Sequence, residues 1–438
     1  MLLNVVYLVV VILALPWVAW RRLTGGRPVA APWQRFMGYA DVPPPEPGLR
    51  RIWLHGVSVG EVQLLASLAA ELERQAAATA QRIEVVVSSS TTTGLEVAGR
   101  RFGADRVFPC PLDFTWAVNR VMDDVRPELI VLGELELWPN LLAAAARRRI
   151  PVVVANARMS VRSFRGYRRV PGLVAAMLRR IAVVSSRSQA DAERFLTLGA
   201  ADVRTTGSMK FDGVRGDRDA PEVERLRRLA GIAADDVVFL AGSTQDPEER
   251  LAAEAYLALR GAHPALRLVL VPRHVERAGE IGRILDGLGV AWQARSRLEH
   301  EGFDPAARVL LVDSTGELSW WWGTATIAFV GGSLDGSRGG QNMLEPAAYA
   351  AAISFGPHTR NFHDEVALFR AAEAAVVVTD GPALTAFVDR CLTDPAWARG
   401  LGERAAALVA DHRGATAATA RLVLKGLPVA DRGIDPAY

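Results

Sequence analysis

This chain of 438 residues has few cysteines and almost no lysine. Cys110 and Cys391 lie far apart without metal-ligand spacing, so the sequence predicts neither a disulfide framework nor a zinc site. This favours a reducing compartment. All but two of the 51 basic residues are arginine, which indicates a composition bias that converts exchangeable lysines. Lys210, retained in the stretch GSMKFD, is therefore a candidate functional residue.

An excess of charge of one sign is also lacking. The formal net charge of +3 is no footprint of nucleic-acid binding, and we expect no nucleic-acid partner. No GxGxxG dinucleotide fingerprint follows a strand, and no Walker A sequence is present. Half of the residues are hydrophobic and 23% are charged, which permits a large core and argues against wholesale disorder. The length suits two α/β domains.

The N-terminus holds one long apolar run. Residues 2–20 are apolar apart from Asn4, and Arg21, Arg22 and Arg27 follow. This length can cross a hydrocarbon core. The charges come after the run and no small-residue cleavage site is present, unlike a secretory signal. We expect a membrane span that leaves the rest of the chain in the cytoplasm, with an anchoring helix on the membrane surface as the alternative.

Short β-rich runs alternate with helical patterns through the rest of the chain, and helices are expected from Glu61, Thr93, Pro139 and Gln189. The strands are continuous apolar runs, which is typical of parallel sheets buried on both faces. Strands are predicted in RIWLHG, RIEVVVSSS, PELIVLGE, PVVVANA and IAVVSS, and then in VVFLAGS, LRLVLVPRH, ARVLLVDS, IAFVGGS, AAISFG and AAVVVT. We expect a membrane anchor, a first Rossmann-like domain, a charged linker, a second Rossmann-like domain and a tail at residues 1–22, 23–213, 214–234, 235–425 and 426–438.

Nearly every predicted strand ends in a polar or glycine-rich signature. In HGVSVGE, Ser58 and Glu61 have the spacing of a capping box, so Glu61 is either only a cap or also a reagent. DSTGE, ending at Glu317, repeats the strand, Ser-x-x-Glu, helix pattern in the second half. A single such turn is an ordinary helix start. Ten of them with arginine, histidine and lysine favour a binding cleft between two domains.

Three of these signatures suit a phosphate group. Arg273 and His274 stand at a strand end, and Arg273 can make a bidentate contact. A glycine-rich loop then leads into a helix expected to start at about Asn342, where backbone N–H groups and the helix dipole favour an anion. Glu345 has cap spacing relative to Asn342, and a carboxylate there is equally suited to a ribose diol.

The ordered motifs are similar to those of one family, the bacterial Kdo transferases, which move 3-deoxy-D-manno-octulosonic acid (Kdo) from CMP-Kdo to the lipid A precursor. The resemblance rests on HGVSVGE, GELELWPN, ANARMS, GSMKFD, AGST, VPRH, DSTGE, FVGGS and GGQNMLEP, and extends from the N-terminal apolar segment to about residue 400. It implies a GT-B fold, a location at the cytoplasmic face of the bacterial inner membrane, CMP-Kdo as donor, lipid IVA as acceptor, and no metal or other cofactor. The first domain would then bind the acceptor and the second CMP-Kdo.

The resemblance also implies roles for single residues. Glu61 would be the general base that deprotonates the acceptor hydroxyl. The CMP-binding segments would be Arg273 and His274, then Thr315, Gly316 and Glu317, then Asn342, Met343, Leu344 and Glu345. Further candidates are Ser58, Gly60, Lys210, Ser243, Gly332 and Gly340. Glu134 and Glu136 match paired glutamates of the family; for them we favour a structural role, in which only one faces the cleft if the strand persists there.

The chemistry fits these residue types. A ketosidic bond to cytidylate is already activated, so departure of CMP needs stabilisation of the phosphate charge, and the attacking alcohol needs one base. Direct inverting displacement therefore suffices. Partial burial would raise the pKa of Glu61, which suits a base. One departure is Gln341, where the family usually has histidine, because glutamine cannot carry a proton.

The run RMSVRSFRGYRRVPGLVAAMLRR mixes arginines with Phe164, Tyr167 and Met177. A solvated surface is one interpretation; beside a membrane anchor we favour contact with anionic inner-membrane lipids and the phosphorylated acceptor. Two alternatives to Kdo transfer remain. One is another GT-B activity, such as a sugar-nucleotide epimerase or a transferase with a UDP donor. The other is a membrane-anchored nucleotide-binding scaffold without catalysis.

Overall fold

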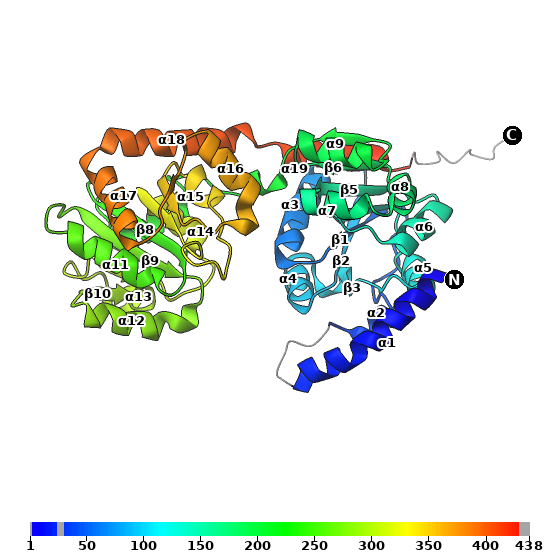
Figure 1. Ribbon diagram of the computed structural model, residues 1–438, viewed down its shortest axis with the longest axis horizontal. Coiled ribbons are helices and arrows are strands. Elements are labelled where there is room, and N and C mark those ends of the chain that lie inside the picture. Colours follow the sequence, from blue (N-terminus) through cyan, green and yellow to red (C-terminus); the bar gives the residue numbers. More distant parts are fainter. Residues whose placement is uncertain (1, 24–29, 429–438) are drawn as a thin grey trace. The chain divides into compact units, whose positions relative to one another are not determined.

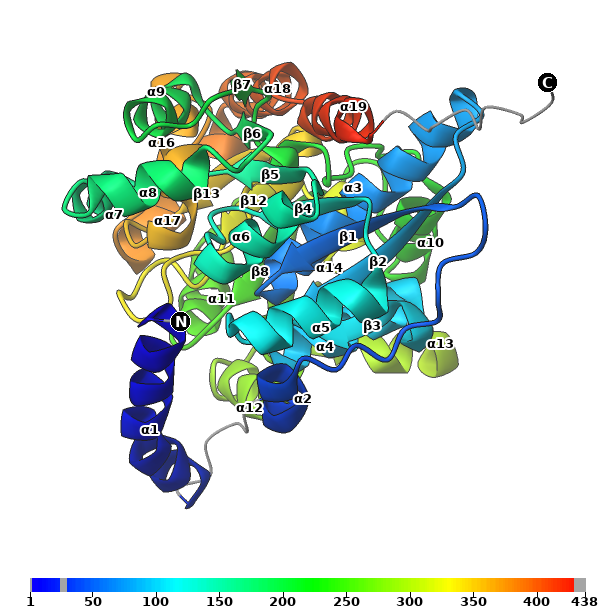
Figure 2. The same cartoon turned by 90° about the vertical axis from the view of Figure 1, so that its right-hand side faces the viewer.

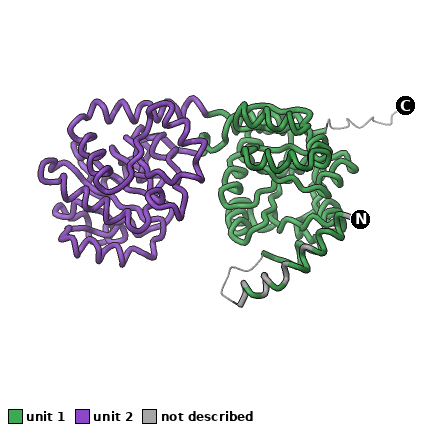
Figure 3. The backbone as a smooth tube through the Cα atoms, in the orientation of Figure 1, with its two compact units in different colours: residues 1–213, 413–438 green, residues 214–412 purple. Residues whose placement is uncertain are grey.

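The computed structural model describes residues 2–23 and 30–428, and the end of the predicted tail, residues 429–438, lies outside them. The chain forms two compact units (Figure 3). Unit 1 comprises residues up to 213 together with residues from 413 on, and unit 2 comprises residues 214–412. Each unit contains one seven-stranded sheet in which every pairing is parallel. The predicted pair of parallel-sheet α/β domains is therefore confirmed.

The sheet of unit 1 has the order β3-β2-β1-β4-β5-β6-β7. Its strands are β1 (Arg50–Gly56), β2 (Ile83–Ser89), β3 (Val107–Pro109), β4 (Leu129–Gly133), β5 (Val152–Ala157), β6 (Val183–Ser186) and β7 (Val203–Thr205). Its helices are α1 (Leu2–Leu23), α2 (Pro32–Met37), α3 (Val59–Ala78), α4 (Thr92–Phe102), α5 (Thr115–Val125), α6 (Pro139–Arg147), α7 (Val161–Tyr167), α8 (Pro171–Leu178), α9 (Gln189–Thr197) and α19 (Ala415–Gly426).

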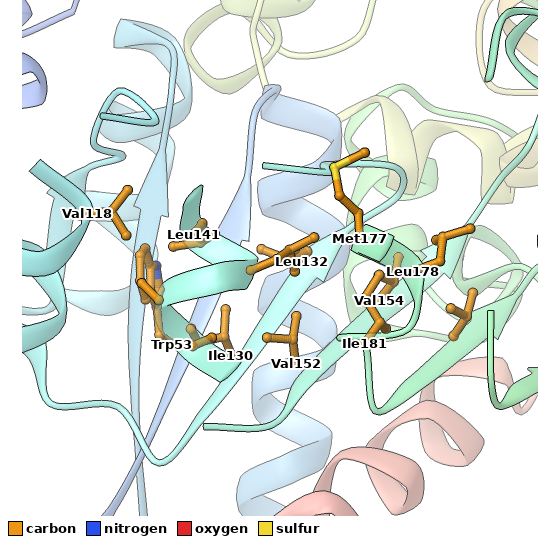
Figure 4. Close-up of a cluster of buried hydrophobic side chains, with 14 of the residues drawn as sticks. Trp53, Val118, Ile130, Leu132, Leu141, Val152, Val154, Met177, Leu178 and Ile181 are labelled. Atoms are coloured by element: carbon orange, nitrogen blue, oxygen red, sulfur yellow. The ribbon is translucent and has the colours of Figure 1, made fainter. Parts of the chain in front are cut away.

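The core of unit 1 lies on both faces of this sheet. Ile130 and Leu132 of β4 point into one cluster, shown in Figure 4, whereas their neighbours Leu129 and Val131 point into the other. Helices α5 and α6 cover the first face, and α3 and α19 cover the second (Figures 1 and 2). Burial on both faces explains why these strands are apolar at every position.

Unit 2 has the sheet order β10-β11-β9-β8-β12-β13-β14. Its strands are β8 (Val237–Thr244), β9 (Leu266–Pro272), β10 (Trp292–Ala294), β11 (Val309–Leu311), β12 (Ile327–Val330), β13 (Ala352–Phe355) and β14 (Val376–Val377). Its helices are α10 (Pro221–Leu229), α11 (Glu248–Leu259), α12 (Ala278–Gly287), α13 (Leu298–Glu301), α14 (Leu318–Trp321), α15 (Leu344–Ala348), α16 (His363–Ala371), α17 (Gly381–Thr393) and α18 (Pro395–Asp411).

The domain boundaries expected from the sequence place two segments differently from the structure. Residues 214–234, expected as a linker, include α10, whose Val223 and Leu226 are fully buried in unit 2. Helix α19, expected in the second domain, packs its Ala420 and Val423 into the core of unit 1. A pattern of apolar residues identifies each helix but not the sheet that it covers.

The N-terminal apolar run forms α1, which contains Pro16. Among residues 2–23 and 30–428, no helix combines the length and the apolar character that crossing a membrane requires. Arg27, one of the charges expected after the span, lies outside the described residues.

Candidate active site

Glu61 lies in the first turn of α3, at the carboxyl end of β1. Ser58 is the N-cap residue, and its Oγ accepts from the Glu61 amide at 3.3 Å. The Glu61 carboxylate turns back over this turn, where it accepts from the Val57 amide at 2.8 Å and from the Ser58 hydroxyl at 2.9 Å. The capping box predicted from the spacing is present. The two donors fix the direction of the carboxylate at the strand end.

Two glycines bring Glu61 close to β4. A Cβ atom on Gly56 would lie 3.2 Å from the Cβ of Glu61 and 2.9 Å from Leu65 Cδ1. A Cβ atom on Gly133 would lie 3.1 Å from the His55 carbonyl oxygen and 3.7 Å from Glu61 Oε2. Residues without side chains therefore let the turn after β1 approach the end of β4. Gly60, another candidate, is exposed in the first turn of α3.

Glu61, Glu134 and Glu136 form a group of carboxylates whose charges affect one another. Burial raises the pKa of Glu61, and the charge of Glu134 adds to this, although the bonds from Val57 and Ser58 oppose it. Burial, followed by the charge of Glu61, raises the pKa of Glu136 to about 7, against the hydrogen bond from Trp138 Nε1 at 2.9 Å. At neutral pH this group therefore readily holds a proton.

The condition that the strand persists through Glu136 is not met. The strand ends at Gly133, and Glu134 takes a left-handed conformation with φ 53°. Alternation along a strand therefore does not separate the two glutamates, and both interact with the charge of Glu61. Glu134 Oε1 also lies 3.8 Å from the guanidinium of Arg187 after β6, a contact that suits the structural role expected for Glu134.

Buried polar side chains of β1 and β2 lie near the ends of these strands. His55 is fully buried, and its Nδ1 lies 2.9 Å from Ser88 Oγ. Burial lowers the pKa of His55 to about 4, so the ring is neutral at physiological pH. The neutral ring of His55 therefore acts as a hydrogen-bonding group toward Ser88. Within the described ranges, no group of three or more histidine, cysteine or acidic residues is arranged to hold a metal ion.

Lys210 lies in a short 3-10 helix, Met209–Phe211, and is partly buried. Its segment is held on both sides. The Met209 amide donates to Oδ1 of Asn156, near the end of β5, at 3.0 Å. The Asp212 carboxylate accepts from the amides of Gly414 and Thr416 at 2.6 Å each, at the start of α19. Lys210 is thus fixed relative to the carboxyl end of the sheet in unit 1.

In unit 2, Arg273 and His274 follow β9 and are exposed. Among the described residues no carboxylate pairs with Arg273, whereas His274 Nδ1 lies 3.3 Å from Glu276. Ser243, Gly332 and Gly340 all have positive φ angles, at 55°, 63° and 81°. A Cβ atom on Gly332 would lie 3.3 Å from the side chain of Gln341. Ser243 lies near the end of β8, Arg273 and His274 follow β9, and Gly332 and Gly340 follow β12, so all lie beyond or at the carboxyl ends of three adjacent strands.

The helix expected to start at about Asn342 starts later in the structure. Helix α15 begins at Leu344, not at Asn342, and has five residues. Asn342 precedes the N-cap residue Met343 and still bonds to the first turn: its Oδ1 accepts from the Leu344 amide and its Nδ2 donates to Glu345 Oε1, both at 3.1 Å. So short a helix has a weak dipole, so an anion there would depend on single N–H groups and side chains. Met343 and Leu344 are fully buried, and burial raises the pKa of Glu345.

DSTGE does not repeat the geometry of HGVSVGE. Helix α14 begins at Leu318, so Glu317 is its N-cap residue rather than the third residue of the helix. Its carboxylate accepts from Ser314 Oγ at 2.6 Å and from Arg295 at 2.8 and 3.0 Å, and these partners lower the pKa of Glu317 against the effect of burial. Thr315 and Gly316 remain exposed.

Glu248 is a site residue that the sequence analysis missed. It is 2% exposed, and its carboxylate accepts from the amides of Gln245, Gly332, Ser333 and Leu334 at 2.7–3.0 Å. Burial raises the pKa of Glu248, and the four amides oppose this. The bonds hold the loop after β12 that contains Gly332. In the sequence, Glu248 is marked only by its place directly after Pro247 at the start of a helical pattern. An acidic residue there is common in ordinary helices, so it did not indicate a site.

The fold and the carboxylate group define an α/β protein of two parallel-sheet domains with polar side chains at its strand ends. Residues 31–213 match the family described as 3-deoxy-D-manno-octulosonic-acid transferase (kdotransferase). The chain is 32% identical to the 3-deoxy-D-manno-octulosonic acid transferase of Haemophilus influenzae over 87% of each chain, and 33% identical to that of Bordetella pertussis over 91% of this chain and 93% of that one. The chain belongs to the 3-deoxy-D-manno-octulosonic acid transferase family and is a glycosyltransferase.

A solved structure supports the fold. UDP-GlcNAc 2-epimerase from Neisseria meningitidis, bound to UDP-GlcNAc, aligns with a TM-score of 0.56 over 86% of this chain and 99% of that one, at 12% identity. So low an identity shows the fold alone. It therefore does not revive the epimerase alternative against the family membership.

The site supplies a pH-dependent contribution to stability. The pKa of Glu136 rises from 4.5 to about 7 on folding, so the folded state binds this proton more tightly than the unfolded state. The contribution is complete below pH 4.5 and is lost as the pH rises through 7. Relative to Glu136→Gln, the free energy of unfolding of the wild type should therefore fall over this range, by on the order of 1 kcal/mol because the carboxyl is partly exposed.

Urea denaturation at several pH values between 4.5 and 7 measures this effect. Glu96→Gln, on the exposed side of α4, is the control and should follow the wild type. Parallel curves for the wild type and Glu136→Gln would show that Glu136 has an ordinary pKa.

Proposed function

We propose that this protein transfers Kdo from CMP-Kdo to the lipid A precursor lipid IVA in lipopolysaccharide core biosynthesis, by metal-independent inverting displacement. The observation that carries the proposal is the partly buried Glu61 carboxylate, whose pKa is raised, at the strand ends of a chain that belongs to the Kdo transferase family. A raised pKa makes a carboxylate a better proton acceptor near neutral pH.

Glu61 is the proposed general base. One oxygen of its carboxylate accepts from the Val57 amide and the other from Ser58, so each keeps a lone pair for an acceptor hydroxyl. Glu134 and Glu136 keep the surroundings negative, which strengthens the attraction for the proton leaving that hydroxyl. Proton transfer to Glu61 then accompanies attack of the acceptor oxygen on the anomeric carbon of Kdo.

The donor groups for CMP are proposed in unit 2. Arg273 is exposed and has no carboxylate partner among the described residues, so it is available to pair with the phosphate, beside His274. Because Glu317 is already bound to Arg295, its proposed role is to hold the turn whose exposed Thr315 and Gly316 meet the nucleotide. The proposed CMP contacts of the third segment come from Asn342 and Glu345, and from the backbone of the buried Met343 and Leu344. Stabilising the phosphate charge assists departure of CMP.

Gln341 restricts which chemical roles the loop after β12 can have. It lies beside Gly332 and can donate and accept a hydrogen bond, but it cannot transfer a proton at neutral pH. We therefore propose that it contributes to binding CMP-Kdo and not to proton transfer.

The proposed location is the cytoplasmic face of the bacterial inner membrane. Besides α1, a segment of unit 1 supports it, residues 161–173, which comprise α7, the connection after it and the start of α8. The segment exposes Val161, Val170 and Leu173, together with the arginines at 162, 165, 168 and 169. Apolar side chains flanked by arginine suit a surface of anionic lipid, which would also hold the acceptor.

The test is incubation of the full-length protein with CMP-Kdo and lipid IVA, with release of CMP and the mass of the lipid product as readouts. We expect a lipid product heavier by one or more Kdo units. The same reaction with a UDP-sugar is the control and should give no product. Preference for the UDP-sugar would overturn the proposed donor, and absence of transfer from any donor would favour a nucleotide-binding scaffold.

A further inference from the structure

Two polar side chains near the start of α1 hydrogen-bond to unit 1. Asn4 Nδ2 donates to Thr115 Oγ1 at 2.6 Å, and its Oδ1 accepts from the Thr115 amide at 3.2 Å. One turn further, the Tyr7 hydroxyl donates to Asp113 Oδ2 at 3.0 Å. The ring of Tyr7 also meets Phe114 edge-on, with the centroids 5.9 Å apart. The N-terminal end of α1 therefore docks at the start of α5 (Figure 1).

Asp113 extends this contact into the body of the unit. It is 5% exposed, and its two carboxylate oxygens accept from the amides of Asn140 and Leu141 at 2.9 and 2.8 Å. Burial raises the pKa of Asp113 to about 6, so it is largely ionised at neutral pH and accepts from the Tyr7 hydroxyl. Asn140 also donates to Asn4 Oδ1, at 3.2 Å. Asn4 and Tyr7 are thus tied to the start of α6, which follows the loop of Glu134 and Glu136.

The two sides of α1 differ in a helical pattern. Leu3, Asn4, Tyr7 and Val11 are partly buried and recur at the spacing of one helix face. On the other side lie apolar residues that are 41–73% exposed, namely Val5, Val6, Leu8, Val9, Ile12 and Leu13. A contiguous apolar face of this kind requires a partner.

Two tryptophans on unit 1 add to the apolar surface. Trp33 at the start of α2 is 67% exposed and Trp116 at the start of α5 is 40% exposed. The Trp116 indole donates to the Phe36 carbonyl oxygen at 2.9 Å, and the rings of Trp116 and Phe36 both pack on Phe114, which also meets Tyr7. Tryptophan is enriched where proteins meet the membrane–water interface. An apolar helix face beside exposed indoles therefore fits a lipid surface as its partner.

The docked N-terminal end is incompatible with a span. A helix of 22 residues is about 33 Å long, enough for a hydrocarbon core of about 30 Å. Unit 1 continues from the far end of α1, so in a span Asn4 would lie across the bilayer from that unit, about 25 Å along the helix from Arg21. Neither Asn4 nor Tyr7 would then reach Thr115 or Asp113.

We propose that α1 lies in the plane of the membrane surface as an interfacial anchor, fastened to unit 1 through Asn4 and Tyr7, with Val5, Val6, Leu8, Val9, Ile12 and Leu13 facing lipid. The inference takes the membrane from the proposed function and adds how the chain meets it. Its consequence is that the carboxylate site is held at a fixed depth relative to the lipid surface, because Asp113 links α1 to α6.

A disulfide cross-link tests the docked geometry in native membranes. Asn4→Cys combined with Thr115→Cys should form an intrachain disulfide in most of the membrane-bound protein, because the two side chains touch. The native cysteines, Cys110 and Cys391, are buried and stay in place. Leu13→Cys with Thr115→Cys is the matched control and should form none, because Leu13 is 73% exposed on the opposite side. A missing cross-link while both cysteines react with maleimide, or a disulfide between two chains, would overturn the proposal.

Vesicle binding tests lipid as the partner of the exposed face. Val9→Asp with Leu13→Asp should lower co-sedimentation with vesicles of anionic phospholipid at least several-fold, whereas Leu196→Asp, at a residue of α9 that is 50% exposed, should not. Unchanged binding of the double variant would overturn lipid as the occupant. Transfer is measured on the same membranes. A cross-link without transfer would refute the proposed function alone, and transfer without a cross-link would refute the docked anchor alone.

Discussion

Replacing Glu61 by glutamine is expected to lower the rate of Kdo transfer by about 10²–10⁴-fold, the usual contribution of a positioned general base. Glutamine fills the same space, and its amide oxygen can still accept from the Val57 amide or the Ser58 hydroxyl. The start of α3 should therefore stay folded, and CMP-Kdo should still bind through unit 2. What is lost is the ability to accept a proton from the acceptor hydroxyl.

The measurement is the initial rate of CMP release at saturating lipid acceptor, together with the melting temperature of each variant. Glu73→Gln, an exposed glutamate on the same helix, is the control and should keep the wild-type rate. Because burial raises the pKa of Glu61, the wild-type rate should decline as the pH falls through that raised value. A Glu61→Gln variant that transfers within tenfold of the wild type would assign the proton to another group.

The sequence predicts much of the fold because of how these sheets are buried. The runs that form β2, β4 and β8 are largely apolar, since both faces of each sheet are covered. The strands β3, β7 and β10 were missed because each has only three residues, without an apolar run that marks a strand. They lie at the sheet edges, where part of their surface faces solvent. Pattern alone does not distinguish such segments from loops.

The site was predictable where its contacts are local. Ser58 and Glu61 are three residues apart, and their spacing predicts the observed cap. Ser314 and Glu317 have the same spacing, but Arg295 from elsewhere in the chain takes the carboxylate, and the helix begins one residue after Glu317. In the same way, the effect of Glu61 on the pKa of Glu136 depends on how β1 and β4 pair. Contacts between residues so far apart in the sequence cannot be predicted from the short motifs around Glu317 and Glu136.

Glu248 is the strongest case of a long-range contact, and its removal is expected to destabilise unit 2 severely. In Glu248→Ala, four backbone amides lose a buried acceptor, among them those of Gly332, Ser333 and Leu334. Each buried unsatisfied donor costs about 1–3 kcal/mol, and these costs overlap because the amides share one loop. We therefore expect a loss of at least about 4 kcal/mol in the free energy of unfolding, a large part of the about 5–15 kcal/mol typical of a domain.

Urea denaturation followed by circular dichroism measures this loss, and Glu254→Ala is the matched control, because Glu254 is exposed on the same helix and should change the stability by less than about 0.5 kcal/mol. Glu248→Gln should fall between the two. Its single oxygen can replace only part of the carboxylate, and its amide hydrogens would face the donors of the loop. Since that loop carries Gly332 beside Gln341, Glu248→Gln should also weaken CMP-Kdo binding more than it changes the rate at saturating donor. If Glu248→Ala unfolds like the wild type, the loop after β12 is held by other contacts, and the carboxylate has no structural role there.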